Sequence, residues 1–230
     1  MRNVMIILKR LNDSFLKQRV LIIMMVIQNV ILSLIVLMYA NMIISNGRLN
    51  GEIDYIQVRF FYNLSIVLLS LIICAYSPFF LSNTLNKLYE NNIIEHLLSV
   101  RVSIREIVFA VFLRGIRTLM ILLISTFPII SISFYFGGFS IMKIIRLLII
   151  LIMFAIFISS ICIYISSMIL DKNVSLTVAY VISFVFMAIN LISLNRVIVS
   201  FSMTFLYLIA MAIISLILLS NARNTVIFNT

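Results

Sequence analysis

Six apolar stretches, each long enough to cross a lipid bilayer, occupy most of this 230-residue chain. A spanning α-helix needs roughly 20 mostly apolar residues. The stretches that meet this length are residues 20–44, 60–81, 107–135, 147–170, 174–194 and 197–219. Charged residues make up only 10% of the chain, compared with roughly 25% in soluble domains. The sequence therefore predicts an all-α integral membrane protein with six transmembrane helices.

The polar segments between the stretches are too short to bury a core of their own, so we expect residues 1–230 to form a single domain. The net charge of +10 does not indicate a nucleic-acid partner, because Lys and Arg stand at the ends of the apolar stretches and form no basic stripe with aromatic residues. Cys74 and Cys162 each fall inside an apolar stretch, where a lone cysteine behaves as a small hydrophobe. We expect no disulfide and no metal site.

The distribution of positive charge predicts how the chain is oriented. An even number of spans places both termini on one side, and short loops rich in Lys and Arg face the cytoplasm. Cytoplasmic termini leave 12 of the 17 Lys and Arg residues inside and five outside. The excess lies mainly in the N-terminal tail and in the loop after the second stretch. We predict a multi-pass protein of the plasma (inner) membrane with both termini in the cytoplasm.

Residues 1–19 have the pattern of an amphipathic helix, with charged residues opposite an apolar face. The apolar residues at helical spacing are Val4, Leu8, Leu11 and Phe15. Such a helix lies in the membrane interface, in contact with the lipid bilayer. The alternative is a disordered basic leader ahead of the first span.

The largest polar interruption follows the second stretch and covers residues 82–106. Its apolar residues recur at helical spacing; they are Leu85, Leu88, Tyr89, Ile93, Leu97 and Leu98. Ser103 and Glu106 have the spacing of a capping box, which predicts a sharp start for the third span. We therefore expect a short amphipathic helix in the cytoplasmic segment 83–106, able to transmit force to the spans on both sides. The alternative is an ordinary solvated loop.

Residues 90–107 resemble the cytoplasmic loop of the ABC-2 type permeases, in which an acidic residue, a Leu-Leu pair and a Pro-Val-Ser-Arg-like turn precede the third helix. The residues that carry the resemblance are Glu90, Glu95, Leu97, Leu98, Val102, Ser103, Arg105, Glu106 and Ile107. The sequence departs from the family at Arg101, where proline is usual, and at Asn92 or Ile93, where glycine is common. The six-span layout and the amphipathic start agree with the family over the whole chain.

The resemblance implies the permease subunit of an ATP-binding cassette exporter, which pairs with a second copy or a similar permease and rests its coupling helix in a groove of a separate ATPase. The residues expected to couple to the ATPase are Glu90, Glu95, His96, Arg101, Arg105 and Glu106. The chain contains no G-x-x-x-x-G-K-[ST] motif, the usual route to bind ATP. ATP and Mg would therefore be held by the partner ATPase, and no cofactor is expected in this chain.

The family also implies a pair of short re-entrant helices between the fifth and sixth spans, for which only residues 195–202 remain. Either the fifth span stops near Ala188 and a reduced hairpin follows, or the feature is nearly absent. A narrow chain without an external domain fits export of a peptide, drug or lipid-like compound better than uptake, which normally needs a binding protein docked outside. Haem export is a further alternative.

Polar residues at membrane depth are the candidates for a substrate path; they are Arg114, Arg117, Asn29, Asn63 and Asn190. The two arginines lie roughly 9 to 14 Å along their helix at 1.5 Å per residue. Facing lipid at that depth is costly, which favours the lining of a cytoplasmic vestibule over the alternative of headgroup anchoring. The pairs Ser159-Ser160 and Ser166-Ser167 are expected to be packing contacts between helices.

An enzyme is not expected, because the chain has one histidine, no acidic residue at the centre of a span and no H-E-x-x-H motif. A non-transporting six-span interaction protein, with an immunity or sensor-anchoring role, is the alternative to transport. A co-purifying ATPase would discriminate between the two.

Overall fold

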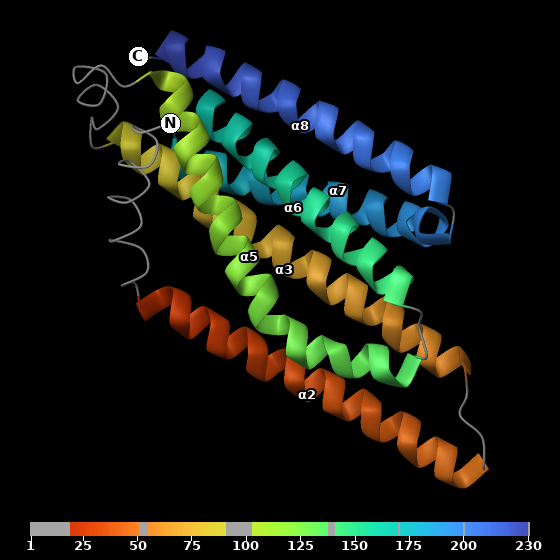
Figure 1. Cartoon of the computed structure of the whole chain (residues 1–230). Helices are drawn as coiled ribbons and strands as arrows, with labels where there is room; N and C mark the ends of the chain where they lie inside the picture. Colours follow the sequence, from red (N-terminus) through yellow and green to blue (C-terminus); the bar gives the residue numbers. More distant parts are fainter. Residues whose placement is uncertain are drawn as a thin grey trace.

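A computed structural model describes residues 19–50, 55–90, 103–137, 141–169, 171–199 and 201–229. These residues form long α-helices and contain no strand (Figure 1). The helices are α2 (Arg19–Asn50), α3 (Tyr55–Glu90), α5 (Ile104–Gly137), α6 (Ile141–Met168), α7 (Lys172–Val199) and α8 (Phe201–Asn229). The N-terminal interfacial helix predicted for residues 1–19 lies outside the described residues, apart from Arg19 at the start of α2.

Each of these helices contains a segment long and apolar enough to cross a membrane. The segments are Ile22–Arg48, Asn63–Ser82, Ile104–Ile129, Ile145–Met168, Lys172–Asn190 and Thr204–Val226. The prediction of an all-helical, multi-pass membrane protein with six spans is confirmed at this level. Successive helices run in opposite directions, so the start of α2 and the end of α8 lie at the same end of the bundle (Figure 1).

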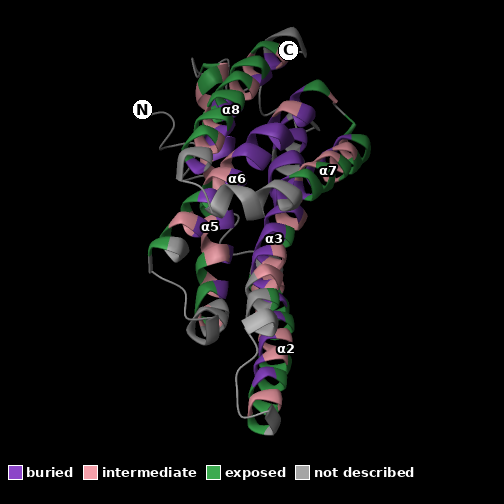
Figure 2. Ribbon diagram, turned by 90° about the vertical axis from the view of Figure 1, so that its right-hand side faces the viewer, coloured by how far each residue is buried: buried purple, intermediate pink, exposed green. Residues whose placement is uncertain are grey.

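Helix α6 occupies the centre of the bundle and packs against α3, α5, α7 and α8. Of its spanning residues 67% are buried, compared with 17% in α2 and 17% in α8. Figure 2 shows the same contrast, with buried residues concentrated on α6 and exposed residues along α2 and α8. The outer helices therefore present large apolar faces, as expected for side chains in contact with lipid acyl chains.

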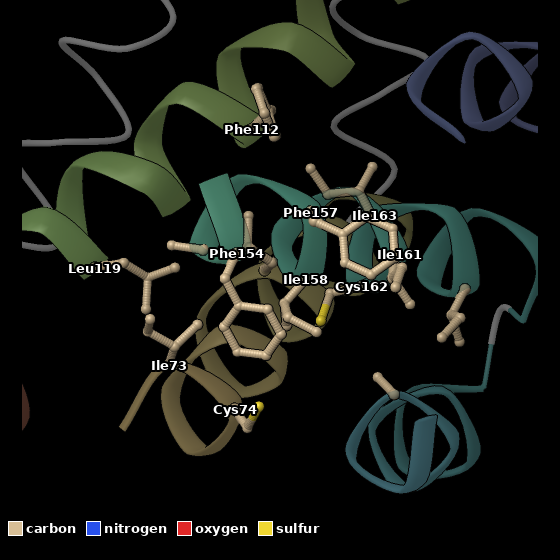
Figure 3. Packing of buried hydrophobic residues seen from close by; sticks show 14 of the residues in the cluster. Ile73, Cys74, Phe112, Leu119, Phe154, Phe157, Ile158, Ile161, Cys162 and Ile163 are labelled. Carbon is tan, nitrogen blue, oxygen red and sulfur yellow. The ribbon is translucent and has the colours of Figure 1, made fainter. Parts of the chain in front are cut away.

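The core is built where α6 meets α3 and α5. Phe154, Ile158 and Cys162 of α6 pack in one buried cluster with Ile73 and Cys74 of α3 (Figure 3). Both cysteines are free and buried, which agrees with the prediction that they act as small apolar residues.

Helices α3 and α5 pack tightly against each other at Gly115. A Cβ atom added there would lie 2.5 Å from Cγ and 3.1 Å from Cδ1 of Leu81, and still closer to Cδ2. Leu81 is fully buried, so its side chain has little room to withdraw. Small residues at such crossings are what allow membrane helices to pack backbone to backbone.

Helix α3 differs from the sequence-based expectation in its length. The second span was predicted to end at residue 81, with a separate cytoplasmic helix beginning at residue 83, but α3 continues without interruption to Glu90. The first eight residues of the predicted coupling segment 83–106 therefore extend the second span. Residues 91–102 of that segment lie outside the described residues.

The connection between α7 and α8 leaves little room for the re-entrant pair. Helix α7 runs to Val199 and α8 begins at Phe201, so a single residue separates them. The described residues of this region contain no separate pair of short helices. The spanning segment of α7 ends at Asn190 and the helix continues to Val199, so both alternatives, a reduced hairpin and a feature that is nearly absent, stay predictions.

Pro78 and Pro128 both lie inside helices, in α3 and α5 respectively. Helix α5 bends in the half that carries Pro128 (Figure 1), as expected where a proline removes a backbone hydrogen bond. In α3, Pro78 removes the N–H that would bond to the carbonyl oxygen of Cys74. The next carbonyl oxygen, that of Ala75, accepts a hydrogen bond from the hydroxyl of Tyr180 on α7 at 3.1 Å, so a neighbouring helix contacts the backbone of the turn before the proline.

Candidate functional site at the common end of α3, α5 and α7

Helix α3 extends beyond its spanning segment at the end of the bundle where α5 and α7 begin. The segment ends at Ser82 and the helix ends at Glu90, which adds eight residues and about 12 Å of helix. We call residues 83–90 the α3 stem. Leu85, Asn86 and Leu88 of the stem are buried, so the stem is packed into the protein and is not a free cytoplasmic arm.

Hydrogen bonds tie the stem region to α6 and α7. The hydroxyl of Ser166 on α6 donates to Oδ1 of Asn86 at 2.6 Å and lies 3.2 Å from the carbonyl oxygen of Ser82. The hydroxyls of Ser82 and Ser175, which lies in the first turn of α7, are 2.9 Å apart. Polar contacts between membrane helices are each worth roughly 0.6 to 2 kcal/mol. Together with the buried leucines, they hold the end of α3 against two other helices.

The start of α5 is fixed by the predicted capping box. The backbone N–H of Ser103 donates to Oε2 of Glu106 at 3.1 Å, and the backbone N–H of Glu106 lies 3.4 Å from the Ser103 hydroxyl oxygen. This arrangement satisfies two amide groups at the start of the helix. The capping prediction is confirmed.

Helix α7 begins in a similar way. One carboxylate oxygen of Asp171 accepts from the backbone N–H groups of Asn173 and Val174 at 2.9 and 3.2 Å. Ile107 and Val108, in the first turns of α5, pack in the same buried cluster as Leu85 and Leu88 of the stem. Residues 91–102 therefore connect two helix ends that are each packed into the core, and the start of α5 is capped.

The residues predicted to couple to an ATPase fall on both sides of this connection. Glu90 is the last residue of α3, while Arg105 is exposed and Glu106 half-buried in the first turn of α5. Glu95, His96 and Arg101 lie outside the described residues. The coupling role of the set stays a prediction, and the structure adds that both ends of the segment are anchored.

The structure does not bring the five predicted substrate-path residues together. Arg114 and Arg117 lie on α5, half-buried and exposed respectively, in the half of the bundle that contains the α3 stem, and Asn29 lies in that half on α2. Asn63 begins the span of α3 and Asn190 ends the span of α7, so both lie in the opposite half.

Asn190 makes a packing contact. Its amide nitrogen donates to the carbonyl oxygen of Phe186 at 2.7 Å, and its side-chain oxygen accepts from the hydroxyl of Tyr207 on α8. The serine pairs also behave as predicted packing residues: Ser159 faces Ser77 of α3 at 3.4 Å, and Ser167 faces Thr225 of α8 at 2.6 Å.

Gln28 is a polar residue that the sequence analysis did not select. Its side chain on α2 is 6% exposed, and neither amide atom has a hydrogen-bond partner among the described residues. A buried amide without partners costs roughly 1 to 3 kcal/mol, so such groups are rare in native proteins. The sequence does show that Gln28 is a polar residue within an apolar stretch, but Asn29 beside it has the same property. Only the burial of the two side chains, which the structure gives, distinguishes Gln28 from Asn29.

Comparison of the chain with protein-family models, with curated proteins and with solved structures finds no match.

Proposed function

We propose that this chain is the permease subunit of an ATP-driven exporter of the ABC-2 type, which moves a peptide, drug or lipid-like compound out of the cytoplasm. The observation that carries the proposal is the anchoring of residues 91–102 between the α3 stem and the start of α5. Both helix ends contribute buried residues to the same core, and the sequence between them resembles the coupling loop of this family.

The anchoring favours the transmission of force from this segment into the membrane. A partner that displaces residues 91–102 also displaces the α3 stem, whose hydrogen bonds reach Ser166 on α6 and Ser175 on α7. Helix α5 moves with α3, because Gly115 and Leu81 leave no space between the two helices at their crossing. A packed assembly of this kind shifts as a body and does not deform gradually.

The proposal includes a second permease and a separate ATPase. Helix α6 fills the centre of the bundle with buried apolar side chains, so we place the substrate route between two copies of this chain, or between it and a similar permease. The chain's sequence has no Walker A motif, so the partner ATPase would hold ATP and Mg²⁺ and supply hydrolysis.

Purification of the tagged chain from its native membrane tests the proposed function. We expect a protein with a G-x-x-x-x-G-K-[ST] motif to co-purify, and the complex to hydrolyse ATP when reconstituted in lipid nanodiscs. Mass spectrometry of the complex identifies the partner, and a catalytically dead variant of the partner provides the control. Recovery of the intact chain with other proteins but no ATPase would favour the non-transporting interaction protein instead.

The orientation in this proposal, with both termini cytoplasmic, predicts which loops react with a reagent outside the cell. Gly51 follows α2 and Gly138 follows α5 at one end of the bundle, whereas Asn92 follows α3 at the other. In a background with Cys74→Ala and Cys162→Ala, cysteines at positions 51 and 138 should react with an impermeant thiol reagent added to intact cells. A cysteine at position 92 should react only after the cells are opened. Labelling of position 92 in intact cells would reverse the orientation.

A further inference from the structure

A groove of about 440 Å³ lies between the first turns of α5 and the last turns of α8. Its lining residues are Arg105, Glu106, Val108, Phe109, Leu216, Leu219, Ser220 and Arg223. In Figure 1 the start of α5 and the end of α8 lie beside each other at the end of the bundle that carries the α3 stem. The groove therefore opens at one edge of the membrane-spanning region.

The lining residues are ordered by depth in the same way on both helices. On α5, Arg105 precedes Phe109 by four residues, about one turn, so both lie on one face with the arginine nearer the helix end. On α8, Leu216 and Leu219 precede Arg223 by seven and four residues, which again places the arginine nearer the end of the helix. Two positive charges thus stand at the rim, above an apolar floor.

The exposure of these side chains shows that the groove is open to a ligand. Phe109 is 49% exposed and Leu216 is 67% exposed, so both floor residues present apolar surface at the depth of acyl chains. Among the described residues, neither Arg105 nor Arg223 forms an ion pair. The acidic lining residue, Glu106, has one carboxylate oxygen at 3.1 Å from the backbone N–H of Ser103. Glu106 keeps its negative charge, so the two arginines give the rim an excess of one positive charge.

We propose that this groove binds one anionic phospholipid from the leaflet at this end of the bundle. The guanidinium groups of Arg105 and Arg223 hold the phosphate, for which their planar, multiply donating geometry is suited. One acyl chain lies along Phe109 and Leu216. Basic pockets between membrane helices on the cytoplasmic side are a recognised mode of binding to acidic lipid headgroups.

The apolar floor of the groove favours a lipid over a free anion as the ligand. A soluble phosphate would leave Phe109 and Leu216 uncovered. A zwitterionic lipid such as phosphatidylcholine also has a phosphate, but its choline cation would stand beside the two arginines and oppose their attraction to it. A ligand with one anionic head and a long chain covers both parts of the groove. The inference goes beyond the proposed export function, because lipid binding at this site requires neither an ATPase nor a transported substrate.

Native mass spectrometry of the purified, delipidated chain tests the proposal. Phosphatidylglycerol and phosphatidylcholine with identical acyl chains are titrated separately, and the first bound lipid is quantified. We expect phosphatidylglycerol to bind at a concentration lower by roughly tenfold or more, since each arginine near the membrane surface contributes to the attraction of acidic lipids. The double variant Arg105→Gln, Arg223→Gln should lose this preference.

Two further variants and one probe make the result specific. Lys87→Gln with Lys172→Gln removes two positive charges at the same end of the bundle but outside the groove, and should keep the preference. The double variant Arg105→Lys, Arg223→Lys retains the positive charge and should keep most of the preference for phosphatidylglycerol. This variant distinguishes an effect of charge from misfolding. A large excess of glycerol phosphate should not displace the bound lipid. Equal binding of both lipids by the native chain, an unchanged preference in the glutamine variant, or displacement by glycerol phosphate would each overturn the proposal.

Discussion

Reversal of the acidic residues at and beyond the end of α3, as Glu90→Lys with Glu95→Lys, is expected to reduce export at least tenfold while the protein remains in the membrane. In the proposed complex these carboxylates face a separate ATPase. Placing like charges at such an interface costs several kcal/mol, and 1.4 kcal/mol already corresponds to a tenfold change in binding. Neither residue lies within a membrane-spanning segment, since the segment of α3 ends at Ser82, so the bundle should fold normally.

The measurement has two parts, the amount of ATPase that co-purifies per permease and the export rate per permease in the membrane. Glu52→Lys with Asp54→Lys is the matched control, because it makes the same change in charge in the segment between α2 and α3, at the opposite end of the bundle. Both quantities should fall only in the first variant. A complex that persists in the first variant with full export would contradict the coupling role of Glu90 and Glu95.

The fold was predictable where the signal is local. Runs of apolar residues identify spans regardless of what packs against them, and the box formed by Ser103 and Glu106 depends on residues three positions apart. The six spans and the start of α5 were therefore correct.

The α3 stem was not predictable in this way. Hydropathy places the end of the second span at Leu81, because Ser82, Asn86 and other polar residues follow. These polar groups are stabilised by Ser166 and Ser175, which are 80 and 93 positions away from the residues they contact. No local pattern indicates that such partners exist.

The candidate site was predictable in type but not in arrangement. Sequence reasoning identified polar residues at membrane depth, yet it grouped Asn190 with Arg114, although these residues lie in opposite halves of the bundle. It also did not distinguish the half-buried Asn29 from the buried Gln28. Which face of a helix is covered depends on its neighbours, and in a membrane both lipid and protein neighbours accept apolar side chains.

Replacement of Gly115 by valine is expected to lower the stability of the folded chain by about 2 kcal/mol, within the roughly 1 to 3 kcal/mol typical of overpacked cores. The added Cβ alone would overlap the Leu81 side chain, and Leu81 is fully buried. For a chain of this size, such a loss corresponds to a fall of roughly 4 to 8 °C in the midpoint of thermal unfolding. Size-exclusion chromatography after heating, in detergent, measures that midpoint.

A paired substitution separates overlap at this crossing from a general intolerance of larger residues. Leu81→Ala removes the atoms that the new side chain meets, so the double variant Gly115→Val, Leu81→Ala should recover at least half of the lost midpoint. Gly47→Ala in the last turns of α2 is the control for a helical glycine, and should be neutral or slightly stabilising because alanine favours the helix by about 1 kcal/mol. If the proposed coupling is right, the single variant Gly115→Val should also export less per folded molecule. The added valine side chain would push apart α3 and α5, the two helices proposed to move together. Full stability of that single variant would show that α3 and α5 are free to separate at Gly115, and the rigid connection between the loop and the membrane would then have to run through α6 and α7 alone.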